Sequence, residues 1–193
     1  MLNDPPPEKR RTHPLEQDPG RPPQPPTTPP STQPPQRHPV MLHIPSVTPR
    51  VTYAVLLINI LVFIIRLTSP ALDEQIFMWG ANHQPYVLQD GEYYRLLSSM
   101  FLHASVYSPR GGFALENSLH LIFNMYILYS IGTALERLFG HARFAIIYLL
   151  GGITGSVLST VFSDANVFSV GASGAVFAVL GAEFVYLYQH RKL

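Results

Sequence analysis

Three polar side chains that could take part in chemistry lie in otherwise apolar stretches of this sequence. His120 and Asn124 are four residues apart, which on a helix places their side chains about 40° apart around the axis and one turn apart along it. Ser173 stands in the run G-A-S-G at the start of another apolar stretch. A serine hydroxyl is a potential nucleophile, and imidazole and amide groups can donate hydrogen bonds to developing negative charge. Nucleophilic catalysis is therefore open to this chain if the fold brings the three together.

Each of these residues also has a purely structural explanation. A serine in a membrane helix usually returns its hydroxyl to a backbone carbonyl of the preceding turn, and His and Asn at this spacing can hydrogen-bond between helices. Gly171 and Gly174 flank the serine, and Phe177 and Gly181 follow it on the same side of the predicted helix. Gly174 forms a row of small residues with Ala178 and Ala182, which lets another helix approach closely. Taken singly, these features favour structure over catalysis.

The elements that must position these residues are long apolar stretches. Four of them cover about residues 51–68, 118–137, 142–162 and 171–189. Each is close to the ~20 residues that an α-helix needs to cross a bilayer. Charged residues make up only 13% of the chain and hydrophobic residues 47%, which argues against an ordinary soluble enzyme. We therefore predict an all-α polytopic membrane protein with four transmembrane helices.

Residues 1–50 have a different composition from the rest. Sixteen of the 19 prolines lie there, and almost no apolar residue precedes Val40. Such a segment cannot bury enough surface to offset its ordering entropy, so we expect a disordered tail with polyproline II character. It is either a solvated spacer or a docking site for a polyproline-binding partner.

Positive charges predict the orientation of the spans. They gather before the first span, between the second and third, and after the fourth: Lys9, Arg10, Arg11, Arg21, Arg37, Arg50, Arg137, Arg143, Arg191 and Lys192. Because short cytoplasmic segments carry the excess of Lys and Arg, we expect both termini in the cytoplasm, with the plasma membrane as the location if the protein is bacterial. Residues 69–117 then form a long outside loop.

Within that loop, apolar residues recur at helical spacing from Tyr93 to Phe101. An amphipathic helix in the membrane interface and a small helix packed on the loop itself both fit this pattern. The whole chain has a net charge of +1 and no cysteine. The charge gives no reason to expect a nucleic-acid partner, and the absence of cysteine excludes disulfides, thiolate metal sites and a cysteine nucleophile.

Four motifs together make the sequence resemble the rhomboid family of intramembrane serine proteases, over roughly residues 50–190. In the family's order they are Y-R-L-L-S-S-M-F-L-H-A-S, H-L-I-F-N, G-T-A-L-E-R-L-F-G and G-A-S-G-A-V-F-A-V-L-G-A. The resemblance implies that residues 51–193 are the four-helix portion of a six-helix core. Two departures are the pair Tyr94-Arg95, where the family usually has Trp-Arg, and an apparent insertion from Val106 to Asn117.

The resemblance also implies roles for single residues. Ser173 matches the nucleophile, and His120 and Asn124 match side chains that form the oxyanion hole with the Ser173 backbone N–H. Gly181 matches the glycine against which a later helix packs. Arg95 and Glu136 belong to the same motifs, and we expect them to pair, since a charge at membrane depth should find a partner.

The general base is expected to be a histidine on a later helix, and the printed sequence ends at Leu193. His190 lies 17 residues beyond Ser173, ~25 Å away along one helix. We therefore expect an endopeptidase acting on transmembrane proteins in the lipid bilayer, without metal or cofactor, and inactive as residues 1–193 alone. A non-catalytic rhomboid-like protein that binds membrane clients is the alternative. A small transporter or channel is the third possibility, and it would be expected to carry charged residues in the middle of the membrane.

Overall fold

A computed structural model describes residues 47–107 and 115–191, without the side chains of Leu115 and Glu116. The predicted proline-rich tail lies outside the described residues up to position 46, and so does most of the predicted insertion. The chain divides into two units, Met1–Leu42 and His43–Leu193. All structural statements below concern the second unit.

Each predicted span forms a helix. The first is α1 (Arg50–Arg66), and the second is a continuous run of α5 (Leu115–Ile127), the π-helical η2 (Leu128–Gly132) and α6 (Thr133–Phe139). The third and fourth are α7 (His141–Phe162) and α8 (Ser173–His190). Within the described ranges, two helices, Asn117–Phe139 and His141–Phe162, are long and apolar enough to cross a membrane. That all four helices cross a membrane remains a prediction.

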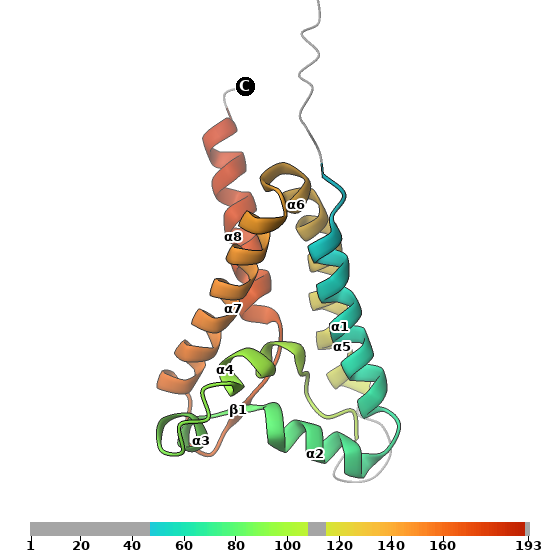
Figure 1. The fold of residues 1–193 in the computed structure, drawn as a ribbon, viewed down its shortest axis with the longest axis vertical. Coiled ribbons are helices and arrows are strands. Elements are labelled where there is room, and N and C mark those ends of the chain that lie inside the picture. Colours follow the sequence, from blue (N-terminus) through green and yellow to red (C-terminus); the bar gives the residue numbers. More distant parts are fainter. Residues whose placement is uncertain (1–46, 108–114, 192–193) are drawn as a thin grey trace, which may run out of the picture. The chain divides into compact units, whose positions relative to one another are not determined.

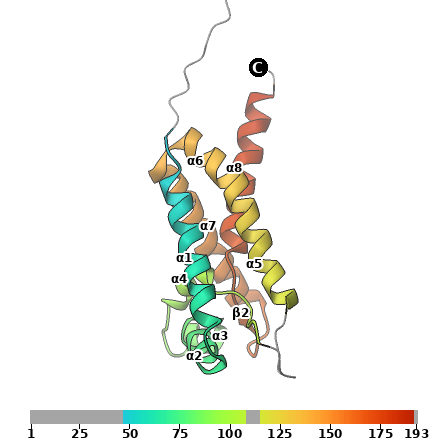
Figure 2. The same cartoon turned by 90° about the vertical axis from the view of Figure 1, so that its right-hand side faces the viewer.

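The start of α1, the helix α6 and the end of α8 lie at one end of this unit, and the loop helices gather at the other (Figure 1). In the view turned by 90°, α1 and α5 both run from the end with α6 toward the loop end (Figure 2). Apolar residues from all the long helices form one core, whose most buried members include Leu128, Leu135, Phe144, Ala175 and Val179. The core therefore binds the first span to the last.

Helices α7 and α8 approach each other closely because small residues face one another. A Cβ atom at Gly174 would lie 3.1 Å from Cα of Gly155, and one at Gly151 would lie 2.1 Å from Cβ of Ala178. Backbones at this separation make extensive van der Waals contact, which is the main attraction between helices in lipid. The glycines thus fix α8, and with it Ser173, against α7.

Residues 70–101 fold into short elements. They are α2 (Pro70–Gly80), β1 (Asn82–His83), α3 (Gln84–Leu88), α4 (Arg95–Ser98) and the 3-10 helix η1 (Ser99–Phe101). The helix expected near residues 93–101 is thus only a short α-helical and 3-10 segment. Met100 on it is buried, and a Cβ at Gly152 of α7 would lie 1.9 Å from Cε of Met100. This part of the loop therefore packs against α7.

A two-stranded antiparallel sheet departs from the all-α expectation. Asn82 pairs with Ser169 and His83 with Phe168, joining β1 to β2 (Phe168–Ser169). The His83 ring stacks on Phe168, with centroids 4.3 Å apart. Strands of two residues are too short to show a period-two pattern, so the sequence could not predict them. The sheet ties the long loop to the segment that leads into Ser173.

The predicted pair between Arg95 and Glu136 is wrong. Arg95 is buried and donates to the carboxylate of Glu92 and to the carbonyls of Met78 and Ala81. It lies on α4, at the end of the unit opposite α6, which carries Glu136 (Figure 1). The guanidinium therefore finds its partners, one carboxylate and two carbonyl oxygens, within its own loop.

Glu136 instead caps the start of α1. Its carboxylate, fully buried, accepts from the backbone N–H groups of Val51 and Thr52 and from the Thr52 hydroxyl at 2.6–2.9 Å. Nδ1 of His141 lies 2.5 Å from Oε1, the carboxylate oxygen that also accepts from Val51. A negative charge at a helix N-terminus satisfies orphan N–H groups and interacts favourably with the helix dipole. This contact therefore joins α1, α6 and α7.

Candidate active site

Ser173 is the first residue of α8, where the chain turns from a tight loop into the helix. Gly171, two residues earlier, has φ +127°, a conformation that residues with a Cβ rarely adopt. Its backbone N–H donates to the carbonyl of Ser99 at 2.9 Å. The first N–H groups of an α-helix have no partner within the helix. Ser173 thus presents its hydroxyl beside backbone donors that can receive negative charge.

The side chain of His120 borders the same space as the Ser173 hydroxyl. A Cβ atom at Gly171 would lie 3.1 Å from Cε1 of His120 and 3.8 Å from Oγ of Ser173. A larger residue at this position would therefore push into the gap between the two side chains. His120 is exposed, and no hydrogen bond between the two groups forms within the described residues.

Asn124 lies one turn further along α5 and is buried. Its Nδ2 donates to the carbonyl of His120 at 2.9 Å. Since an amide carries two N–H donors, one donor stays available beyond this bond. The bond fixes the amide on the side of the helix that carries His120. Ser173, His120 and Asn124 therefore lie on two neighbouring helices, with Gly171 between the hydroxyl and the imidazole.

A polar cavity of about 250 Å³ opens beside Ser173, between α7, α8 and the long loop. Its hydroxyl lining comes from Ser99, Ser156, Ser159, Ser169 and Ser173, and Phe177 and Gly174 also border it. A cavity with several hydroxyl groups can hold water molecules, which need two to four polar partners each. Hydrolysis within an apolar bundle requires such a place for water.

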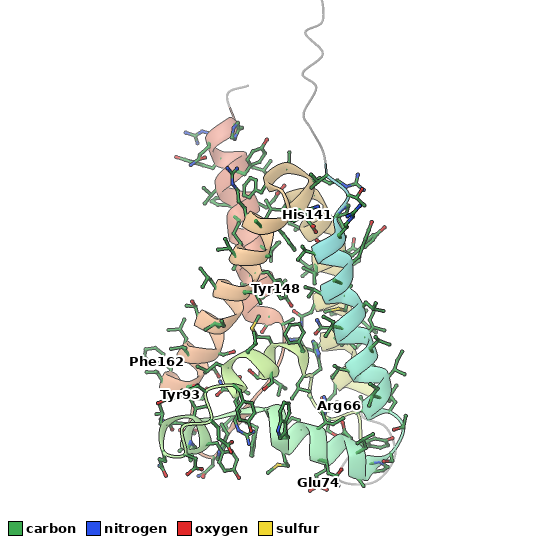
Figure 3. All side chains as sticks on the ribbon, in the orientation of Figure 1. Arg66, Glu74, Tyr93, His141, Tyr148 and Phe162 are labelled. Atoms are coloured by element: carbon green, nitrogen blue, oxygen red, sulfur yellow. The ribbon has the colours of Figure 1, made fainter. Side chains whose placement is uncertain are left out.

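The other described histidines lie away from the Ser173 hydroxyl or serve elsewhere. His141 contacts Glu136 at the far end of the bundle (Figure 3), and Nδ1 of His190 lies 2.8 Å from a carbonyl at the end of α8. His103 is buried behind His120, and burial lowers its pKa to about 4, helped by the charges of His120 and Arg66. Such a weakly basic imidazole is a poor proton acceptor near neutral pH.

Gly181 lies two turns beyond Ser173 and faces open space. No atom would lie within 4 Å of a Cβ at this position. Gly181 lines an apolar cavity of about 500 Å³ with Phe139, Ala182, Val185 and Tyr186. Phe177, on the same side of α8, is 72% exposed. Within the described residues, the face of α8 that carries Gly181 therefore has no packing partner at this glycine.

Sequence reasoning missed two contributors to the site. Ser99 holds Gly171 through its carbonyl, and its hydroxyl lies 3.3 Å from that of Ser156. Asn82 donates to the carbonyl of Ser156 and accepts from the hydroxyl of Thr160. The spacing of Ser156 and Thr160 on one helix was an available signal. Their partners lie more than 50 residues away in the sequence, so no local pattern could identify them.

Comparison with known proteins identifies relatives for most of this chain. A family model of the rhomboid domain matches residues 90–193. Rhomboid protease GluP of Bacillus subtilis (strain 168) is 37% identical over 147 residues, covering 75% of this chain and 26% of GluP. RHOMBOID-like protein 4 of Arabidopsis thaliana is 43% identical over 95 residues, covering 49% of this chain and 21% of that protein. The chain thus spans less than a third of either relative's length.

Proposed function

Because this chain belongs to the rhomboid family, we propose that it is part of an intramembrane serine endopeptidase. The reaction is hydrolysis of a peptide bond in or near the transmembrane segment of another membrane protein. Ser173 is the nucleophile. The observation that carries the proposal is the position of the Ser173 hydroxyl, which faces His120 across Gly171 and borders a polar cavity.

In the proposed first step, Oγ of Ser173 attacks the scissile carbonyl carbon while its proton passes to a base. The carbonyl oxygen becomes an oxyanion, which accepts hydrogen bonds from the Ser173 backbone N–H and from His120 and Asn124. The tetrahedral intermediate then expels the amine, which takes the proton from the base. Removing one oxyanion donor of this kind typically slows such a reaction by about a hundredfold or more.

The second step releases the acyl-enzyme. A water molecule loses a proton to the base and attacks the acyl carbon, and Ser173 leaves with the proton restored. The hydroxyl-lined cavity beside Ser173 is a suitable reservoir for this water, because it opens at the nucleophile itself. Water held at this point does not have to cross the apolar outer faces of the helices.

The base is proposed to be a histidine on a further helix, as the family pattern implies. Gly181 supports this proposal, because its side of α8 has room for a close helix neighbour. His120 is a less suitable base. Its place one turn from Asn124 fits a donor role, and no hydrogen bond to the serine hydroxyl forms within the described residues.

The proposed membrane topology rests on the four apolar helices and on the positive charges that flank them. We infer four membrane spans in residues 50–190, with both termini in the cytoplasm and the long loop outside. The start of α1 and the end of α8 lie at one end of the unit, in line with this topology (Figure 1). The cavity beside Ser173 lies toward the loop end, so transmembrane substrates would be cut near the outer side of the membrane.

The test uses the full-length protein in lipid vesicles with a fluorescent transmembrane substrate. Ser173→Ala should abolish both cleavage and labelling by a fluorophosphonate probe. Ser130→Ala removes an exposed hydroxyl from η2, in the same bundle, and should leave both unchanged. Cleavage that persists in Ser173→Ala would disprove the assignment of the nucleophile.

A client-binding protein without proteolytic activity is the second candidate. It is favoured by one observation: no described histidine hydrogen-bonds to Ser173. It predicts that the wild-type full-length protein retains a transmembrane client, for example in co-purification, without cutting it. Wild-type cleavage that depends on Ser173 would exclude this candidate.

A further inference from the structure

We propose that His103 is a positioning residue for the oxyanion donor His120, held in place by a buried Arg66–Asp73 ion pair. The inference rests on the proposed function, since it assigns a task to a residue behind the catalytic pair. Four observations carry it: the bracing of the backbone at 103–105, the burial of His103, its ring contact with His120, and the exposure of His120.

The brace begins at the junction of α1 and α2. Nε of Arg66 lies 2.6 Å from Oδ1 of Asp73, and both side chains are almost fully buried. Arg66 is at the end of α1, where the chain turns toward α2 (Figure 3). A buried ion pair is costly unless further hydrogen bonds satisfy its remaining atoms. Nη2 of Arg66 is buried without a hydrogen-bond partner within the described residues, but the groups that bond to the other atoms of the pair should be fixed with it.

The groups that bond to the ion pair belong to His103 and Ser105. Nη1 of Arg66 donates to the backbone carbonyl of His103 at 2.5 Å, and the Ser105 hydroxyl donates to the other oxygen of Asp73. Nδ2 of Asn117 then donates to the carbonyl of Ser105 at 2.6 Å. Asn117 lies three residues before His120, on α5. The ion pair thus fixes the backbone at 103–105 to α1, α2 and α5 together.

The His103 side chain reaches His120 directly. The two rings meet edge to face, with centroids 5.7 Å apart and an interplanar angle of 67°. His103 is 1% exposed, whereas His120 is exposed to solvent. An exposed side chain samples several rotamers unless a neighbour restricts it. The fixed ring of His103 restricts the His120 ring, whose Cε1 lies next to Gly171 and near the Ser173 hydroxyl. In this proposal, that restriction keeps the imidazole beside Ser173.

His103 is suited to a positioning role and to no proton transfer. Its pKa of about 4 keeps it neutral at physiological pH. Nε2 of His103 is buried and has no hydrogen-bond partner within the described residues. The ring therefore acts through its shape and its edge. A phenyl ring of similar shape should replace it, and a branched aliphatic side chain of similar volume should not.

The experiment compares His103→Phe with His103→Leu in the full-length protein, with cleavage measured in lipid vesicles. Leu should lower kcat roughly tenfold, because small displacements of a catalytic group cost one to two powers of ten. Phe should retain kcat within about threefold of wild type, the scatter expected for a conservative ring replacement. KM should stay unchanged in both variants, because His103 does not contact the substrate. Ser98→Ala is the matched control: it removes a bond from the same loop to the carbonyl of Gly80 and touches neither histidine.

A double-mutant cycle separates positioning from a general effect on folding. In a His120→Ala background, His103→Leu should cause no further loss of kcat, because coupled residues are not additive. An independent tenfold loss there, or equal kcat for Leu and Phe, would overturn the inference. If instead Ser173→Ala still cleaves, the proposed function fails while the coupling of the two histidines can still be read from the cycle.

Discussion

Two glycines on α8 have opposite surroundings. Gly174 is so close to α7 that a Cβ there would lie 3.1 Å from Cα of Gly155, whereas a Cβ at Gly181 would meet nothing within 4 Å. For both of them, the sequence predicts a place where another helix can approach. The comparison teaches that a small residue on a helix shows where that helix can be approached closely. Which neighbour uses each position depends on the rest of the fold.

The largest expected effect concerns the face of α8 that carries Gly181, its open side. If a further helix that carries the base packs at Gly181, residues 1–193 alone should cleave a transmembrane peptide at least about a thousandfold more slowly than the full-length protein. Loss of one member of a catalytic unit typically costs several powers of ten. The two proteins are compared in the same vesicles, with Ser173→Ala of each as the blank.

The isolated chain should also react poorly with a fluorophosphonate probe. A reaction as fast as that of the full-length protein, and dependent on Ser173, would contradict this prediction. It would mean that His120 or a partner subunit acts as the base. The open side of α8 would then have no part in the chemistry.

The face of α8 that packs on α7, its closed side, should lose stability when a larger residue replaces Gly174. Gly174→Val places three carbons where the backbone of α7 leaves no room, and overpacking of this kind costs about 1–3 kcal/mol or more. The midpoint of thermal unfolding in detergent should fall for residues 1–193 and for the full-length protein alike. Gly174→Ala serves as a graded control with a smaller decrease. An unchanged midpoint in the Val variant would show that α7 and α8 are further apart than described.

On the open side, the effect of a Gly→Val substitution should differ between residues 1–193 alone and the full-length protein. Gly181→Val should leave the free energy of unfolding of residues 1–193 within about 0.5 kcal/mol of wild type, as surface substitutions do. In the full-length protein it should reduce cleavage by roughly tenfold, because a displaced base no longer reaches Ser173. Equal behaviour in both proteins would show that no helix packs at Gly181.

Much of this architecture could be predicted from the sequence because the apolar stretches are long. The four helices match the predicted ranges within a few residues. A Cβ at Gly171 would lie within 4 Å of both the His120 ring and the Ser173 hydroxyl, but the roles of these residues remain predictions. Arg95 shows where the family pattern misled. Its acidic partner is Glu92, only three residues earlier in the sequence, whereas the family pattern pointed to Glu136. Its other partners are two carbonyl oxygens of its own loop, and because every residue carries a carbonyl, no residue type marks such a partner.

The ion pair of Arg66 with Asp73 escaped prediction for a different reason. The two residues are seven apart in the sequence, and a helix that continued through both would place them two turns apart, too far for a contact of 2.6 Å. The helix is interrupted between α1 and α2 at residues 67–69, and the change of direction there brings the side chains together. Pro70 marks the start of the second helix, but the direction of the turn is set by tertiary packing.

The smallest effect tests a third glycine, which lies against a flexible side chain. A Cβ at Gly152 would lie 1.9 Å from Cε of Met100. Because an unbranched thioether can change rotamer, Gly152→Ala should cost only about 1 kcal/mol, less than bulk placed against the backbone. The double variant with Met100→Ala should lose less stability than the sum of the two single variants, because the new methyl group fills part of the void that Met100→Ala leaves. A cost equal to that of Gly174→Val, with additive effects in the double variant, would show that Met100 is held as rigidly as the α7 backbone. The loop would then be a third packed layer of the bundle, and the distinction between closed and open faces would extend beyond α8.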